Sequence, residues 1–209
     1  MLSACSNVDD SELFADITAT SNEAIEHSKD LSTAYANAYE NASSLQLFFK
    51  EHQTTATFVG VGNEFASFSE ETIWLTDHIV QTSIDNGGAF IYSVYRISEQ
   101  AIELVYEGVT EPNMTIEQIA KLPVIELYLA LPLKQGTSFG SWTITDVDVT
   151  VNTPFKSFTD VIEVMKEIDG STSYRYFAPG FGLIKQVESL EMGENMFKIS
   201  STLEGISYE

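Results

Sequence analysis

From residue 54 onward, the sequence alternates between short runs of β-branched and aromatic residues and short turn-forming stretches. Runs of this kind, bounded by Gly, Pro, Asn and Asp, predict β-strands. No segment between the runs has the length and periodicity of a crossover helix, which argues against a parallel sheet. The pattern predicts a mainly β fold built on an antiparallel sheet of about ten short strands.

The clearest local signal is the stretch Asp85-Asn86-Gly87-Gly88, because Asn-Gly supplies the positive φ angles of a hairpin turn. One helical turn is also predicted after Asn113. The sheet is expected either to curl into a half-barrel or to form two stacked, sandwich-like layers, and the sequence leaves both arrangements open. Strands are predicted at 54–61, 78–84, 89–97, 101–107, 141–152, 161–168, 171–178, 181–190 and 196–203.

The N-terminal part of the chain has a different composition. Residues 6–44 are acidic and polar and contain neither Gly nor Pro. Thr20 and Glu23 have the spacing of a capping box, which predicts a helix over about 21–43. We therefore expect a helical or disordered spacer over 6–48, followed by a β-rich domain over 49–209.

Residues 1–5 end in Leu2-Ser3-Ala4-Cys5, which has the form of a bacterial lipobox. Cys5 is the only cysteine, so no internal disulfide can form and its position favours a lipid attachment. Only Met1 precedes the motif, where a signal peptide would have a charged and an apolar region. Either a signal peptide has been removed from the sequence, or the tetrapeptide is a coincidence.

The charge of the chain limits its partners. Its 31 acidic residues against 10 basic ones give a formal net charge of −21. Nucleic acid is excluded as a partner because binding phosphates requires Lys and Arg to displace counterions. A small cationic ligand is compatible with this charge.

Motifs of catalysis and metal binding are absent or better explained by strand structure. Asp146 and Asp148 have the spacing of a calcium loop, but Val151 stands where that loop needs its glycine. His78 lies beside Asp77 in a predicted strand, and neighbouring strand residues point to opposite faces. We predict no catalytic residue, no metal and no cofactor.

Aromatic residues are the remaining chemical resource. A curled antiparallel sheet can use them to line a hydrophobic ligand pocket, although they can equally form the core. The pocket candidates are Trp74, Tyr92, Tyr106, Trp142 and Tyr176.

Four stretches resemble uncharacterised cell-surface lipoproteins of Gram-positive bacteria: Gly62 to Phe68, Asp85 to Gly88, Thr153-Pro154 and Tyr176 to Lys185. Proteins of that group combine a lipobox, a polar spacer and one β-rich domain. The resemblance implies an extracytoplasmic location on the outer face of the cell membrane. It implies no reaction and no catalytic residues.

We therefore expect a lipoprotein held to the membrane by a lipid on Cys5. Its β domain is expected to bind a small apolar or cationic ligand, or a protein of the cell envelope, without catalysis. The alternative is a carboxylate-dependent hydrolase of cell-envelope polymers, which needs two Asp or Glu side chains about 5–10 Å apart in a cleft.

Overall fold

The computed structural model describes residues 44–192 and 195–208. The lipobox with Cys5, and the predicted spacer up to residue 43, lie outside the described residues. The elements are η1 (Ser44–Phe48), β1 (Thr54–Val61), β2 (Phe68–Thr76), β3 (Ile79–Asp85), β4 (Phe90–Ile97), β5 (Ala101–Gly108), α2 (Ile116–Ile119), β6 (Glu126–Ala130), β7 (Ser138–Phe139), β8 (Trp142–Asn152), β9 (Ser157–Ile168), β10 (Ser171–Ala178), β11 (Gly182–Met192) and β12 (Asn195–Tyr208).

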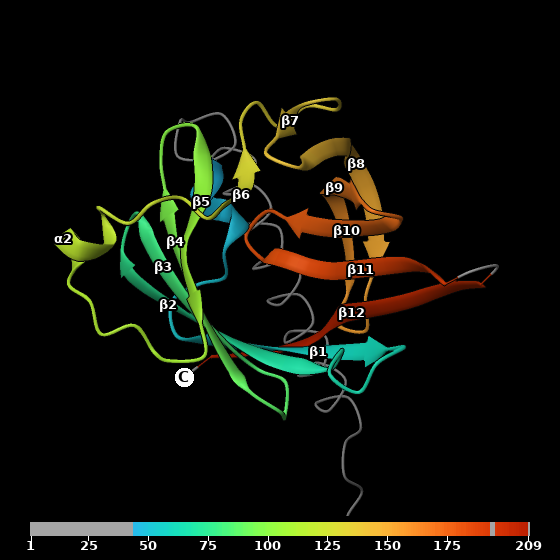
Figure 1. The fold of residues 1–209 in the computed structure, drawn as a ribbon, viewed down its shortest axis with the longest axis horizontal. Coiled ribbons are helices and arrows are strands. Elements are labelled where there is room, and N and C mark those ends of the chain that lie inside the picture. The colour runs from blue at the N-terminus through green and yellow to red at the C-terminus, as the bar shows by residue number, and fades with distance from the viewer. Residues whose placement is uncertain (1–43, 193–194, 209) are drawn as a thin grey trace, which may run out of the picture. The chain divides into compact units, whose positions relative to one another are not determined.

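All twelve strands belong to one antiparallel sheet with the order β6-β5-β4-β3-β2-β1-β12-β11-β10-β9-β8-β7. Strands β1 to β6 form one meander, β7 to β12 form a second, and the pairing of β1 with β12 joins them (Figure 1). The two edge strands, β6 and β7, are in contact. The sheet is therefore curled and nearly closed, which confirms the predicted antiparallel β class and identifies the curled arrangement.

The structure adds strands that the sequence pattern did not predict, namely β2, β6 and the two-residue β7. β2 has adjacent acids, Glu70 and Glu71, in its first half, and acidic residues are depleted in strands. It forms because Glu70 and Glu71 point to opposite faces and each finds a polar environment there, as described below.

The hairpin between β3 and β4 forms where it was predicted, and its connection is four residues long, 86–89. Only Gly87 has a positive φ, of 77°. The side-chain oxygens of Asp85 and Asn86 accept hydrogen bonds from the backbone amides of Gly87, Gly88 and Ala89. Side-chain acceptors thus take the role that backbone pairing has in a two-residue turn.

Helix η1 packs inside the curled sheet and fills it. Phe48 is fully buried, and Leu45 and Phe49 belong to the same core cluster as Trp142. The helix also fits closely against the turn from β10 to β11, where Gly182 has a φ of +62° and a Cβ at this position would lie 2.5 Å from the carbonyl oxygen of Phe48. Leu45 and Phe48, which lie in the stretch expected to end the spacer, thus contribute to the core of the β domain.

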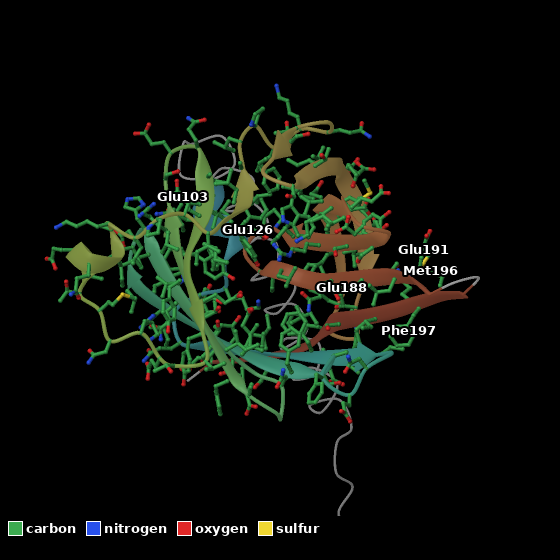
Figure 2. The ribbon with its side chains drawn as sticks, in the orientation of Figure 1. Glu103, Glu126, Glu188, Glu191, Met196 and Phe197 are labelled. Carbon is green, nitrogen blue, oxygen red and sulfur yellow. The ribbon has the colours of Figure 1, made fainter. Side chains whose placement is uncertain are left out.

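A cluster around Glu126 connects the two halves of the sheet where its edges meet (Figure 2). Glu126 on β6 accepts hydrogen bonds at Oε1 from Trp142 Nε1 at 3.2 Å and from Arg175 Nη1 at 2.9 Å. Lys166 Nζ lies 3.7 Å from Glu126 Oε2. The guanidinium carbon of Arg175 also lies 4.3 Å from the centroid of the Trp142 ring. One glutamate of the first meander is thereby bound to β8, β9 and β10 of the second.

Candidate functional site

The outer face of β2, β3 and β4 provides the floor of the candidate site. Glu71 on β2, Ser83 on β3 and Tyr92 on β4 are directly opposite one another in the register. Residues opposite each other in antiparallel strands point to the same face. Ile73 and Gln81 form the next row of the same face.

The segment that links β5 to β6 crosses this outer face and forms one wall. It contains the helical turn α2, whose start is fixed by a capping box between Thr115 and Gln118. The turn predicted after Asn113 is therefore present. Ile119, 1% exposed, packs into a small apolar cluster with Ile79 and Val94 of the sheet.

Polar contacts hold the crossing segment at both ends. Tyr106 donates a hydrogen bond through its hydroxyl to the carbonyl oxygen of Thr110 at 2.6 Å. Arg96 donates from Nη1 to the carbonyl oxygens of Ala120 and Leu122, and its Nη2 lies 2.7 Å from Glu103 Oε2. The wall is thus held to the sheet independently of any ligand.

Between this wall and the sheet lies a groove with a volume of about 520 Å³. Small-molecule sites of proteins have volumes of roughly 300–1,000 Å³ and combine apolar walls with a few polar groups. This groove has both kinds of surface: apolar and aromatic side chains, two carboxylates, two hydroxyls and one amide. The lining residues are Glu71, Ile73, Leu75, Gln81, Ser83, Phe90, Tyr92, Glu111, Pro112, Met114 and Ile119.

The structure distributes the five predicted pocket aromatics over several places. Tyr92 lines the groove, and Tyr106 packs against the apolar cluster beside it. Trp142, 2% exposed, and Trp74 lie in the interior cluster that η1 fills, where Trp74 Nε1 donates to the carbonyl oxygen of Lys50. Tyr176 packs against a second interior cluster. The structure brings only Tyr92 and Tyr106 to the neighbourhood of one site.

The inner face of the same strands carries a buried ion pair. Lys50 Nζ lies 2.7 Å from Glu70 Oε1, and both side chains are at least nine-tenths buried. Beside the pair is a small cavity of about 10 Å³, lined by Tyr95 and Tyr128 among others. Such a volume corresponds to a single water molecule and is far too small for a ligand.

The two tyrosines beside this cavity are strongly affected by their environment. Burial, together with the nearby charge of Glu70, raises the pKa of Tyr95 from 10.0 to about 12. Burial also raises the pKa of Tyr128 well above its ordinary value, and the neighbouring Tyr95 adds to this effect. Both phenols thus keep their proton to a higher pH than an ordinary tyrosine does. Tyr128 belongs to the interior cluster and Tyr95 packs against it, so the cavity is part of the core.

Sequence reasoning missed the acidic residues of the groove, Glu71 and Glu111. Glu71 follows Glu70 directly, so the pair gave no alternation of polar and apolar residues. Glu111 lies in the loop before α2, and only the three-dimensional path of that loop brings it to β3. The continuous apolar run Ile73-Trp74-Leu75 after Glu71 does not indicate which face of the strand is exposed.

Asp146 and Asp148, weighed above as calcium ligands, lie in strand β8. Asp146 Oδ1 accepts hydrogen bonds from the backbone amides of Val147 and Asp148. Among the described residues, no group of three or more His, Cys, Asp or Glu side chains is arranged to hold a metal ion. Within the same ranges, no helix has the length and apolar character needed to span a membrane.

Comparison with known proteins gives similarity in structure only. No protein-family model matches the chain, and no curated protein matches it in sequence. A solved structure from Bacteroides fragilis, described as "a putative exported protein with YmcC-like fold", is 13% identical, with a TM-score of 0.49. A second, from Parabacteroides distasonis, described as "a putative lipoprotein", is also 13% identical, with a TM-score of 0.47. Each comparison covers 77% of this chain and 98% of the other.

Both organisms belong to the Bacteroidetes. The similar structures are thus described as an exported protein and a lipoprotein, but neither comes from a Gram-positive bacterium. The resemblance to lipoproteins of Gram-positive bacteria stays a prediction from the sequence.

Proposed function

We propose that this chain is an extracytoplasmic lipoprotein whose β domain binds a small ligand in the groove over β2, β3 and β4, without catalysis. The protein is held to the outer face of the membrane by a lipid on Cys5. The observation that carries the binding function is the groove itself, a preformed space of about 520 Å³ with mixed apolar and polar walls. In the part of the chain that the structure describes, η1 packs into the interior of the sheet, and the cavity beside it has a volume of only about 10 Å³.

The anchoring part of the proposal rests on the sequence. Leu2 to Cys5 has the lipobox form, and Cys5 is the only cysteine of the chain. A cysteine that carries diacylglycerol contributes two acyl chains, which is enough for stable attachment where one chain is marginal. The intact mass of the protein isolated from the membranes of its own organism tests this part. A lipid-modified Cys5 supports it, and an unmodified Met1 terminus in the soluble fraction contradicts it.

Native mass spectrometry of the full-length protein after incubation with cell-envelope extract tests the binding part. We expect a retained small molecule on the wild type and none on Ser83→Trp, which places an indole in the groove. Phe90→Ala provides a second groove variant with little risk to folding, because Phe90 is 53% exposed. Equal retention by the wild type and both variants would exclude the groove as the binding site.

The carboxylate-dependent hydrolase is the second candidate. The observation in its favour is that Glu71 and Glu111, which are 40 positions apart in the sequence, both line the groove. Glycoside hydrolysis uses two carboxyl groups on either side of the bond that breaks. Release of soluble sugar from purified envelope polymers by the wild type, abolished in Glu71→Gln and in Glu111→Gln, would establish this function in place of binding alone.

A further inference from the structure

The groove has a strongly one-sided charge. Its eleven lining residues include two glutamates, Glu71 and Glu111, but no Lys, Arg or His. Within residues 44–192 and 195–208, neither carboxylate takes part in a salt bridge. By contrast Glu70, Glu103 and Glu126, which lie on β2, β5 and β6, are all paired with Lys or Arg.

The hydrogen bonds that the two groove carboxylates accept from side chains come from neutral groups. The Ser83 hydroxyl donates to Glu71 Oε2 at 3.2 Å, and the Gln81 amide donates to Glu111 Oε1 at 3.4 Å. A carboxylate has about four acceptor positions on its two oxygens. These contacts orient Glu71 and Glu111 while leaving most of their acceptor capacity and all of their charge available.

The arginine on the same face of the sheet is already engaged. Arg96 of β4 lies opposite both Ile79 and Glu103 in the register, on the outer face. Its guanidinium group contacts Glu103 and donates to the carbonyl oxygens of Ala120 and Leu122. Turning it toward the groove would leave Glu103 without its partner and release the crossing segment. Arg96 is therefore not available to neutralise the carboxylates of the groove.

Beside the carboxylates, the groove presents aromatic and aliphatic surface. The rings of Phe90 and Tyr92 are nearly parallel, with an interplanar angle of 21° and centroids 6.4 Å apart. Aromatic faces attract organic cations and also provide apolar contact area. Ile73, Leu75 and Met114 extend the apolar part.

We propose that the ligand of the groove is an organic cation with an apolar body. Its ammonium group lies between the carboxylates of Glu71 and Glu111, and its apolar body lies on Phe90 and Tyr92. Anionic ligands are excluded because the groove offers them no positive partner and the chain has a net charge of −21. This inference rests on the proposed binding function of the groove and specifies its ligand class.

Three probes with the same alkyl chain test the proposal: octyltrimethylammonium, octanol and octyl sulfate. Each is titrated into the full-length chain, and binding is followed by the shifts of the backbone amide signals of the groove residues. We expect octyltrimethylammonium to bind about tenfold more tightly than octanol, as two partly exposed carboxylates warrant. We expect no groove binding of octyl sulfate. The preference for the cation should weaken as salt is added.

Variants that remove the charges of Glu71 and Glu111 test whether these two carboxylates cause the preference for the cationic probe. In Glu71→Gln/Glu111→Gln, the affinity for octyltrimethylammonium should fall to that for octanol, while the affinity for octanol stays the same. The matched control is Glu188→Gln/Glu191→Gln, which makes the same change of net charge on the β11–β12 hairpin of the other meander (Figure 2). This control should retain the full preference for the cation.

The outcomes separate this inference from the proposed function. If octanol and octyltrimethylammonium bind the groove equally, and the glutamine variants change nothing, the cationic class is wrong while the binding function holds. Preference for octyl sulfate would also overturn it. If no probe shifts the groove signals, and the envelope extract yields no ligand blocked by Ser83→Trp or Phe90→Ala, both proposals fail.

Discussion

Glu70 and Glu71 are neighbours on β2, yet the sheet places them in opposite environments. Glu70 points inward, where it is buried and paired with Lys50 at 2.7 Å. Glu71 points outward into the groove, where its side-chain partner is the neutral hydroxyl of Ser83. Burying a charge is costly unless it is paired, so the inner carboxylate needs its lysine. The outer one is partly hydrated and can keep its charge for a ligand.

The same contrast holds for the two faces as a whole. On the inner face, η1 and the aromatic residues fill the space, leaving a cavity of about 10 Å³. On the outer face, the crossing segment stands away from the strands and leaves about 520 Å³. The inner face is therefore closely packed, whereas the outer face leaves the space in which we propose that a ligand binds.

Removal of core volume should have the largest effect on the inner face. Phe48→Ala should lower the free energy of unfolding by about 4 kcal/mol, because it removes a fully buried ring and leaves a cavity. Phe90→Ala on the outer face should cost less than about 1 kcal/mol, because its ring is half-exposed. Urea denaturation of both variants measures this difference. Equal losses would contradict the assignment of η1 to the core.

The second largest loss of folding stability should follow from removing one partner of the buried Lys50–Glu70 ion pair. Glu70→Gln should cost about 3 kcal/mol, because Lys50 is left buried without a countercharge. The double variant Lys50→Met/Glu70→Leu is the control. It removes both charges and should recover most of the stability in a double-mutant cycle. A double variant as unstable as Glu70→Gln would show that packing, and not charge, is what the pair contributes.

A smaller, pH-dependent effect should arise from Tyr95, whose pKa is raised from 10.0 to about 12 by burial and by Glu70. A raised pKa means that the folded state binds the phenol proton more tightly than the unfolded state. The resulting stabilisation is complete below pH 10 and is lost as the pH rises toward about 12. Denaturation across this range should show a steeper loss in the wild type than in Tyr95→Phe. Parallel curves would mean that Tyr95 ionises in the folded state as it does in the unfolded state.

The smallest effect on stability is expected at Glu71. Glu71→Gln should change the free energy of unfolding by no more than about 0.5 kcal/mol, because the side chain is only partly buried and has no salt bridge among the described residues. Thermal and urea denaturation of Glu71→Gln and Glu70→Gln, measured side by side, compare the two losses of stability. A loss similar to that of Glu70→Gln would show that Glu71 supports the fold.

The strands whose alternation or turn signals are local were predictable from the sequence. β1, β8 and β10 lie within a residue of their predicted bounds, and the Asp85–Gly88 turn is present. β2 was missed because its burial pattern includes an inward glutamate, which becomes favourable only through Lys50. Lys50 lies 20 residues away from Glu70, so a pattern within one strand cannot predict that the two side chains pair.

The candidate site was less accessible to sequence reasoning. Tyr92 was named for its aromatic ring, but Trp74 and Trp142 gave the same signal and lie in the interior. Which face of a strand is covered depends on the path of η1 and of the segment between β5 and β6. Both paths are set by contacts between distant residues, such as Arg96 with Leu122 and Gly180 with Leu47.

The pairing of β1 with β12 has a consequence for how the chain reaches its native state. Within each meander, neighbouring strands follow one another in the sequence, so their hairpins can form early and locally. The hydrogen bond that Ser207 Oγ of β12 donates to the carbonyl oxygen of Thr55 on β1 instead joins residues 152 positions apart. A chain that emerges N-terminus first therefore has to keep β1 as an open edge until its last strand has been made. A chain that ends before β12 would keep both β1 and β11 as open edges, and such edges can pair with other chains and aggregate.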